Sequence, residues 1–152
     1  MREALDVGAI RAAAHDWRVD VVEETGSTNA DLLARAAAGE DIAGAVLLAE
    51  YQTAGRGRHD RQWSAPPRAQ VAMSVGVDTT GIPTDTWGWL PLLTGVAAVE
   101  TLREYVDAGL KWPNDVMVGT GKLGGVLSEV ANAGVVVVGI GINVSLTADE
   151  LP

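Results

Sequence analysis

The last third of the chain constrains the fold more than any other part. It contains LKWPNDVMV, KLGGVLSEV and VVVVGIGINV, three apolar segments separated only by GTG and NAG. Thr120-Gly121 and Ala133-Gly134 suit short turns, so the three segments predict neighbouring strands of an antiparallel meander. The last segment is apolar at nearly every position, which indicates burial on both faces of a sheet.

The first two thirds of the chain supply the helices. Helical patterns cover three segments, 4–16, 27–39 and 86–106, and strand patterns cover three others, 18–25, 44–51 and 69–77. Ser27 or Thr28 can cap the second helix, and Pro91 marks either the start of the third helix or a kink within it. Helices and strands do not alternate regularly, so we expect an α+β fold in one domain, residues 1–152. Its sheet should be mixed and largely antiparallel, with helices on one side.

The composition excludes several kinds of site. The 152 residues include no cysteine and two histidines, which rules out disulfides, cysteine-based zinc sites and a thiol nucleophile. The net charge of −9 argues against general nucleic-acid binding, which needs a basic face. No apolar run approaches the ~18 residues of a membrane span, and the N-terminus does not resemble a signal peptide. We therefore expect a cytoplasmic protein that binds neither DNA nor membranes.

Positive charge is concentrated in one segment of this acidic chain. Residues 52–68 hold four arginines against one acid, Asp60, a net of +3, so the remaining residues sum to −12. Gly55 and Gly57 lie among the arginines. Arginine presents a rigid fork of donors to carboxylates and phosphates, and glycine lets backbone N–H groups approach an anion. The pattern favours a loop that binds a nucleotide, a carboxylate or an acyl phosphate; the alternative is a solvated surface loop.

Two further segments suggest ligand contacts. KWPND, residues 111–115, predicts a turn that brings Lys111 close to Asp115, although an ordinary surface turn would have the same sequence. Lys111 and Lys122 are the only lysines, and both adjoin turns or glycines. In GIGIN, residues 139–143, glycines inside a strand allow another group to approach closely or simply allow a helix to pack. Asn143 could present its amide to a ligand.

Five segments in this order resemble the biotin protein ligases, also called biotin–[acetyl-CoA-carboxylase] ligases. They are ETGSTNADL, AEYQTAGRGRHDRQW, LKWPNDV, GKLGGVLSE and VVGIGINV. Lipoate ligases and octanoyltransferases share the fold, but GRGRxxRxW and KWPND are similar to the biotin branch. The resemblance implies the biotin/lipoate ligase catalytic core, a class II synthetase-like fold.

The resemblance also implies a reaction. Such enzymes join the carboxylate of biotin to ATP, release pyrophosphate and hold biotinyl-5′-AMP, which a lysine of a biotin carboxyl carrier domain then attacks. The reactants of the first step are anionic, so cations and fixed N–H donors are needed rather than a protein nucleophile. The arginine-rich loop is then an anion clamp that is mobile until the ligand arrives. ATP and Mg²⁺ are the expected cofactors, with biotin as substrate.

Residue roles follow from the resemblance alone. The residues similar to biotin contacts are Ser27, Thr28, Asn29, Gln52, Gly55, Arg56 and Lys122. Those similar to nucleotide contacts are Arg56, Gly57, Arg58, Lys111, Trp112, Asn114 and Asn143. Those expected to act in catalysis are Lys122, Arg58 and Asp115. Trp63 and Trp112 would line the biotin and adenine regions. No metal ligand is certain, although Mg²⁺ bound with ATP is expected near Asp115.

Three departures from the family pattern qualify these expectations. Position 60 is Asp where the family usually has Gly, so the carboxylate could pair with Arg58 or Arg61, or weaken anion binding. No helix-turn-helix segment precedes the core, which argues against a DNA-binding repressor. The chain stops soon after GINV, so we expect a truncated core without the C-terminal SH3-like domain.

One expectation about association and two alternative functions remain, and the first follows from the short C-terminus. An exposed apolar patch should favour self-association, for instance as a homodimer. The chain could be a biotin- or nucleotide-binding fragment that does not transfer biotin. It could also be a lipoyl or octanoyl ligase or transferase.

Overall fold

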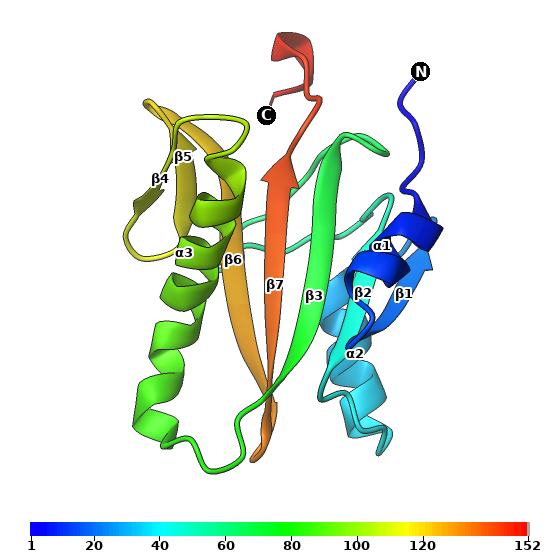
Figure 1. Ribbon diagram of the computed structural model, residues 1–152, viewed down its shortest axis with the longest axis vertical. Coiled ribbons are helices and arrows are strands. Elements are labelled where there is room, and N and C mark those ends of the chain that lie inside the picture. Colours follow the sequence, from blue (N-terminus) through cyan, green and yellow to red (C-terminus); the bar gives the residue numbers. More distant parts are fainter. Residues whose placement is uncertain (152) are drawn as a thin grey trace.

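A single seven-stranded sheet organises the molecule. The computed structural model describes residues 1–151 (Figure 1). In spatial order the strands are β1 (Arg18–Val22), β2 (Ala45–Ala49), β3 (Gln70–Asp78), β7 (Val135–Asn143), β6 (Gly121–Asn132), β5 (Asp115–Val118) and β4 (Ala108–Lys111). Only β1 and β2 are parallel; every other neighbouring pair is antiparallel. The predicted mixed, largely antiparallel sheet is confirmed.

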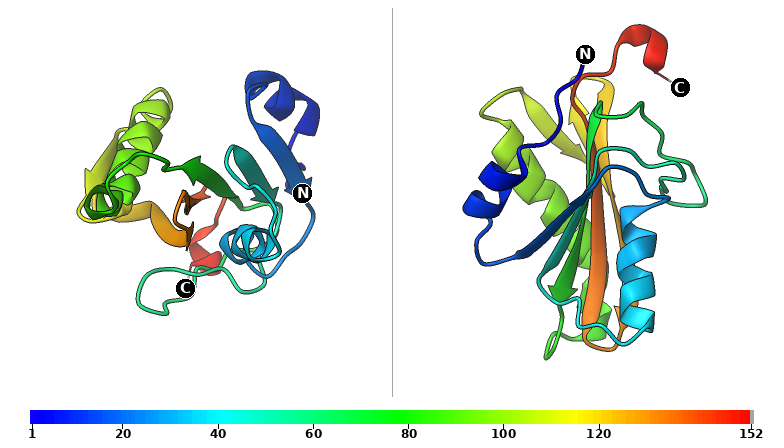
Figure 2. Two further views of the ribbon diagram at one scale, coloured as in Figure 1. Left: turned by 90° about the horizontal axis from the view of Figure 1, so that it is seen from below. Right: turned by 90° about the vertical axis from the view of Figure 1, so that its right-hand side faces the viewer.

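Helices lie on both faces of this sheet, so the expectation that they lie on one side is wrong. They are α1 (Val7–Ala13), α2 (Thr28–Ala37) and α3 (Leu90–Leu102), with 3-10 turns η1 (Thr84–Trp89) and η2 (Ala148–Glu150). α2 covers one face, while α1 and α3 lie across the other (Figure 2).

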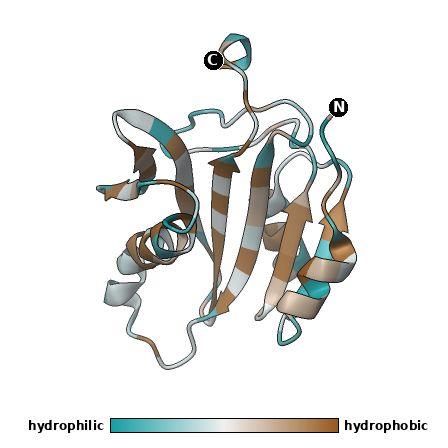
Figure 3. Cartoon of the chain, turned by 45° about the horizontal axis from the view of Figure 1, so that its top comes forward, coloured by the Kyte–Doolittle hydropathy of each residue, from teal (hydrophilic) through white to brown (hydrophobic). Residues whose placement is uncertain are grey.

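The central strand explains why both faces must be covered. In β7, the consecutive valines 135–138 are all buried, as the apolar run predicts. Val137 packs in the cluster under α2 with Leu32, while Val136 packs in a cluster on the opposite face with Leu90 of α3. The apolar bands along β3 and β7 are visible in Figure 3. A strand with apolar residues at consecutive positions needs a helix on each side because successive side chains point to opposite faces.

The segment 110–118, predicted as one strand, forms two. β4 ends at Lys111 and β5 begins at Asp115, with a tight turn between them that contains a cis Trp112–Pro113 peptide. Proline has no N–H to give to the ladder, so Pro113 belongs in the turn rather than inside a strand. Lys111 lies directly opposite Asp115, which confirms that the turn brings the two residues together.

The third helix begins in the way that its proline indicates. α3 starts at Leu90 and carries Pro91 in its first turn. It is only half-buried, however: Leu93 on its outer surface is 64% exposed, and Trp89 just before it is 60% exposed. Exposed apolar side chains therefore gather on η1 and α3 rather than on β7. Among residues 1–151 no helix is long and apolar enough to cross a membrane.

Candidate active site

A cavity of about 390 Å³ opens beside the N-terminal end of α2. It lies between that helix end, the segment that joins β2 to β3, and the β4–β5 turn. The predicted site residues that line it are Ser27, Thr28, Asn29, Gln52, Arg56, Gly57, Arg58, Trp63, Lys111, Trp112, Asn114, Asp115 and Lys122. Gly55 and Asn143 were also predicted and do not line it. Segments far apart in the sequence thus meet at one cavity.

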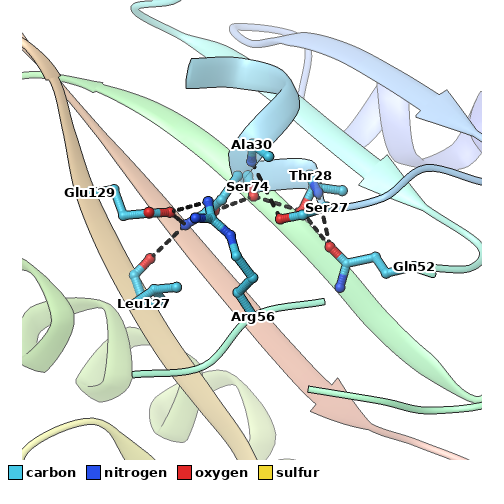
Figure 4. A network of polar contacts seen from close by, with 9 residues as sticks. Ser27, Thr28, Ala30, Gln52, Arg56, Ser74, Leu127 and Glu129 are labelled. Carbon is cyan, nitrogen blue, oxygen red and sulfur yellow. Dashed lines mark hydrogen bonds and ion pairs between the residues drawn. The ribbon is translucent and has the colours of Figure 1, made fainter. Parts of the chain in front are cut away.

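A buried polar base closes one side of the cavity. It consists of Ser27, Thr28, Asn29, Gln52 and Ser74, all at most 9% exposed. Ser27 accepts a hydrogen bond from the Ala30 N–H at 3.3 Å and so caps α2. Of the two caps that the sequence predicted, Ser27 or Thr28, the structure uses Ser27. The Thr28 N–H and Oγ1 both donate to Gln52 Oε1, at 2.9 and 3.2 Å (Figure 4). Because its oxygen accepts from Thr28, the Gln52 amide has a fixed orientation that leaves Nε2 to donate.

The side-chain amide of Asn29 forms its hydrogen bonds with other groups of the protein. Its Nδ2 donates to the Leu127 carbonyl at 3.1 Å and to Glu129 Oε2 at 2.9 Å, and its Oδ1 accepts from Ser74 Oγ at 2.5 Å. A Cβ atom on Gly139 would overlap the Asn29 amide. Asn29 belongs to α2, so this glycine of GIGIN allows the helix to pack closely on the sheet, which is one of the two readings that the sequence left open. Asn29 orders the base, and both of its amide hydrogens are already used.

Trp63 occupies the space over the second glycine of the same strand. A side chain on Gly141 would overlap the Trp63 indole, whose Nε1 donates to Gln70 Oε1 at 2.5 Å. Gln70 lies opposite Asn143 across β3 and β7. Within residues 1–151, Gln70 Nε2 and Asn143 Oδ1 are buried without a hydrogen-bond partner. One buried donor and one buried acceptor are thus available behind the indole for a polar group.

A cationic wall faces the polar base. We call residues 55–63 the Arg-Gly loop; it is a narrow turn closed by Gly57 N–H to Arg61 O at 2.7 Å and Trp63 N–H to Gly55 O at 2.8 Å. Among the lining residues, five carry positive charge (Arg56, Arg58, Arg61, Lys111 and Lys122), whereas Asp115 is the only carboxylate. The lining therefore sums to +4 in a chain of −9.

Asp60 lies at the tip of this loop in an unusual backbone conformation. Its φ is +58°, in the left-handed region that favours glycine, and the preceding His59 has φ +55°. Within the described residues Asp60 forms no ion pair with Arg58 or Arg61. The left-handed φ gives a physical reason for a glycine at this position, and the pairing considered from the sequence is absent.

Lys122 and Asp115 form an ion pair within the cationic wall. Lys122 Nζ lies 2.9 Å from Asp115 Oδ1 and 5.5 Å from the centroid of the Trp63 ring. Asn114 Nδ2 donates to the Val126 carbonyl at 2.9 Å, which ties the β4–β5 turn to β6. Lys111 is opposite Asp115 in register, but Lys122 is the residue that pairs with the carboxylate. A lysine held between a carboxylate and an indole face is well placed to meet an incoming anion.

Sequence reasoning missed several residues of the site. Ser74 links Thr28 to Asn29, and Glu129 accepts from Asn29 and Arg56. The apolar lining also went unnoticed: Met73, Val126, Leu127 and Ile140. Ser74 was detectable in principle as a polar residue inside an apolar strand, and Glu129 as the acid that ends GKLGGVLSE.

Comparison with known proteins agrees with this geometry. The profile of the "Biotin/lipoate A/B protein ligase family" matches residues 21–146, which include the whole of the polar base and the cationic wall. This chain belongs to that family. It is 50% identical over 161 residues to the biotin–[acetyl-CoA-carboxylase] ligase of Mycobacterium tuberculosis, covering 99% of this chain and 60% of that protein. The resemblance to the biotin branch is confirmed.

Solved structures of the family share the fold. A biotin acetyl coenzyme A carboxylase synthetase from Helicobacter pylori, with bound biotinylated ATP, has a TM-score of 0.76 and 31% identity, over 85% of this chain and 62% of that one. The Aquifex aeolicus biotin protein ligase, in complex with biotin and ATP, has a TM-score of 0.74 and 32% identity, over 89% and 55%. This chain therefore spans 55–62% of the length of these three proteins.

Proposed function

We propose that this protein activates biotin with ATP to biotinyl-5′-AMP and transfers the biotinyl group to a lysine of a biotin carboxyl carrier domain. The observation that carries the proposal is a single cavity with a neutral polar base on one side and a cationic wall on the other. A biotin molecule has a neutral ureido ring at one end and a carboxylate at the other. The two sides of the cavity match these two ends.

The polar base suits the ureido ring. Ser27 and Gln52 would meet the ring directly, with Gln52 Nε2 as donor to its carbonyl. Thr28 and Asn29 would act mainly by holding these groups in place, since their hydrogens are used within the protein. A preorganised base loses little entropy when the ligand binds.

The cationic wall suits the reacting groups. In the first step, an oxygen of the biotin carboxylate attacks the α-phosphorus of ATP and pyrophosphate leaves. Lys122 would contact the carboxylate and the α-phosphate oxygens, and Gly55 to Arg58 would close over them. A donor aimed at developing charge contributes about 10²–10³ in rate. Asp115 would then orient or deprotonate the carrier lysine, whose amine attacks the acyl carbon of the mixed anhydride to form an amide as AMP leaves.

The nucleotide would extend toward the β4–β5 turn. Lys111, Trp112 and Asn114 lie there, and Trp112 is 68% exposed, so it could cover a flat ring. Asn143 Oδ1 and Gln70 Nε2, which have no hydrogen-bond partner within residues 1–151, would suit the polar edge of the adenine ring if the nucleotide reaches behind Trp63. These assignments extend the roles that the family resemblance implies.

Magnesium fits the site only as a partner of the phosphates. Within residues 1–151 no group of three or more metal-binding side chains is arranged to hold an ion, and Asp115 is the one carboxylate of the lining. Mg²⁺ commonly uses one or two protein carboxylates and takes its other ligands from phosphates and water. Asp115 would therefore hold the ion together with ATP, and the ion would neutralise charge on the phosphates.

The test is to incubate the protein with biotin, ATP and Mg²⁺ and to measure biotinyl-5′-AMP by mass spectrometry, then to add a carrier domain and measure its labelling. We expect both products. Adenylate without carrier labelling would favour the alternative of a biotin- or nucleotide-binding fragment that does not transfer. Competition with lipoate and octanoate tests the lipoyl or octanoyl reading, and stronger activation of either acid than of biotin would overturn the proposal.

Self-association is a separate expectation. Trp89 and Leu93 are exposed apolar side chains on η1 and α3, and they support a homodimer through this surface. Light scattering across a range of protein concentrations tests it; a monomer at all concentrations would contradict it.

A further inference from the structure

Glu129 holds a position in the site that the proposed reaction does not use. It lies on β6, and its Oε2 accepts from Arg56 Nη2 at 2.8 Å and from Asn29 Nδ2 at 2.9 Å (Figure 4). The Glu129 side chain is 25% exposed and that of Arg56 is 43% exposed. The Arg-Gly loop therefore has an ionic contact with the sheet, on the same side as the polar base.

The contact with Asn29 does not explain why a charged residue is there. The amide of Asn29 is already oriented by Ser74 Oγ, which donates to its Oδ1, and by the Leu127 carbonyl, which accepts from its Nδ2. A neutral acceptor at position 129 could accept the second Nδ2 hydrogen of Asn29 equally well. The charge of Glu129 acts mainly on Arg56, the cation with which it pairs.

The ion pair of Glu129 with Arg56 makes Glu129 compete with the anionic group of a ligand for Arg56. Under the proposed function, Arg56 meets the carboxylate of biotin or a phosphate oxygen. A second anion that approaches Arg56 is attracted by the guanidinium and repelled by the Glu129 carboxylate next to it. Like charges a few ångströms apart oppose one another strongly in a partly desolvated site. Arg58 and Arg61, by contrast, have no acidic partner among the described residues.

We propose that Glu129 is a specificity-determining residue that competes with the ligand's anionic group for Arg56. In the free protein it holds Arg56 against β6. A ligand displaces it only if it brings an anion to the Arg-Gly loop while its neutral end occupies the polar base. Glu129 thereby weakens the binding of loosely held anions more than that of a ligand fixed at both ends. This inference rests on the proposed function of the site.

Glu129→Gln tests the proposal because it keeps the shape and an acceptor oxygen for Asn29 while it removes the charge. Calorimetry should give 3- to 10-fold tighter binding of biotin, and binding of the neutral biotin amide unchanged within twofold. Glu40→Gln is the matched control, since it removes the same charge at the far end of α2, whose ten residues span about 15 Å. Equal or weaker binding of biotin by Glu129→Gln would overturn the proposal.

A second measurement does not depend on biotin. Phenylglyoxal modifies accessible arginines, and mass spectrometry can follow Arg56 with Arg68 as an internal reference. In Glu129→Gln, inorganic pyrophosphate should protect Arg56 at a concentration more than tenfold lower than in the parent protein, since a loosely held anion should gain more than biotin does. If this shift occurs but neither protein binds biotin, the proposed function fails and the competition stands. If the protecting concentration is the same in both proteins, Glu129 does not compete for Arg56.

Discussion

The polar base and the cationic wall lie on either side of one cavity, yet they are built in opposite ways. The base is buried, and a chain of hydrogen bonds from Gln52 through Thr28 and Ser74 to Asn29 fixes its side chains. The wall stands on a loop whose arginines at 56, 58 and 61 are exposed and whose backbone has only a few internal hydrogen bonds. A neutral group is best recognised by fixed partners, whereas an anion can draw flexible cations around itself.

The difference teaches how the two regions should respond to change. Loss of a group in the base should reduce stability and weaken all ligands alike, because the base is part of the fold. Loss of a cation in the wall should leave the fold intact and affect only charged ligands and the chemical step. The following variants test this division, in order of decreasing effect.

Lys122→Gln should have the largest effect. The ammonium lies between Asp115 and the Trp63 ring, where it would meet charge that develops during adenylate formation. We expect single-turnover adenylation to slow by about 10²-fold or more, with the melting temperature nearly unchanged. Lys122→Arg, which retains the charge, is the control and should fold normally. If Lys122→Gln forms the adenylate at the parent rate, Lys122 is a surface residue with no role in the chemical step.

Arg58→Ala should weaken binding of a non-hydrolysable biotinyl-adenylate mimic by about 10- to 100-fold, since a charge-assisted hydrogen bond contributes about 1.5–3 kcal/mol. Binding of biotin alone should change less. Arg68→Ala is the matched control: Arg68 pairs with Glu23 outside the cavity and carries the same charge. Calorimetry on both variants decides the matter, and equal affinity of Arg58→Ala and the parent for the mimic would contradict the assignment.

Ser74→Ala tests the base. The hydroxyl is fully buried and bridges Thr28 Oγ1 and Asn29 Oδ1, so its removal should leave at least one buried polar group without a hydrogen-bond partner. We expect the free energy of unfolding to fall by about 1–3 kcal/mol, and biotin and the adenylate mimic to lose affinity by similar factors. Ser64→Ala, at an exposed position, is the control for urea denaturation. A selective loss of the adenylate mimic alone would break the division between the two regions.

Asp60→Gly should have the smallest effect. It removes a negative charge beside the arginines and relieves the left-handed backbone at φ +58°. We expect binding of the adenylate mimic to become about 2- to 3-fold tighter, because a surface charge contributes up to about 1 kcal/mol. Asp60→Asn removes the charge but retains the side chain, so it separates the two causes. Weaker binding by both variants would mean that Asp60 helps the loop rather than hinders it.

Much of this architecture is predictable because it depends on local patterns. The valine run 135–138 predicts a strand buried on both faces, and the Pro-Asn turn correctly brings Lys111 to Asp115. The same valine run should have predicted helices on both sides of the sheet, since successive side chains in a strand point to opposite faces.

The site was less predictable because its contacts are long-range. The pairing of Lys122 with Asp115 depends on the register between β5 and β6, which contains an irregularity between Val116 and Met117. Glu129 reaches Asn29 across 100 positions of the chain, and Ser74 reaches Thr28 across 46. No spacing in the sequence encodes such pairs, which arise only once the strands have taken their order.

Amide hydrogen exchange, with and without the biotinyl-adenylate mimic, tests the division between base and wall most directly. The first turn of α2, residues 28–31, should be protected in the free protein and should change little on binding. The Arg-Gly loop, residues 55–63, should exchange rapidly in the free protein and gain protection when the mimic binds, because the anion draws the arginines together. Equal protection of the loop in the free and bound forms, or a gain at α2 as large as that in the loop, would contradict a fixed base and an adaptable cationic wall.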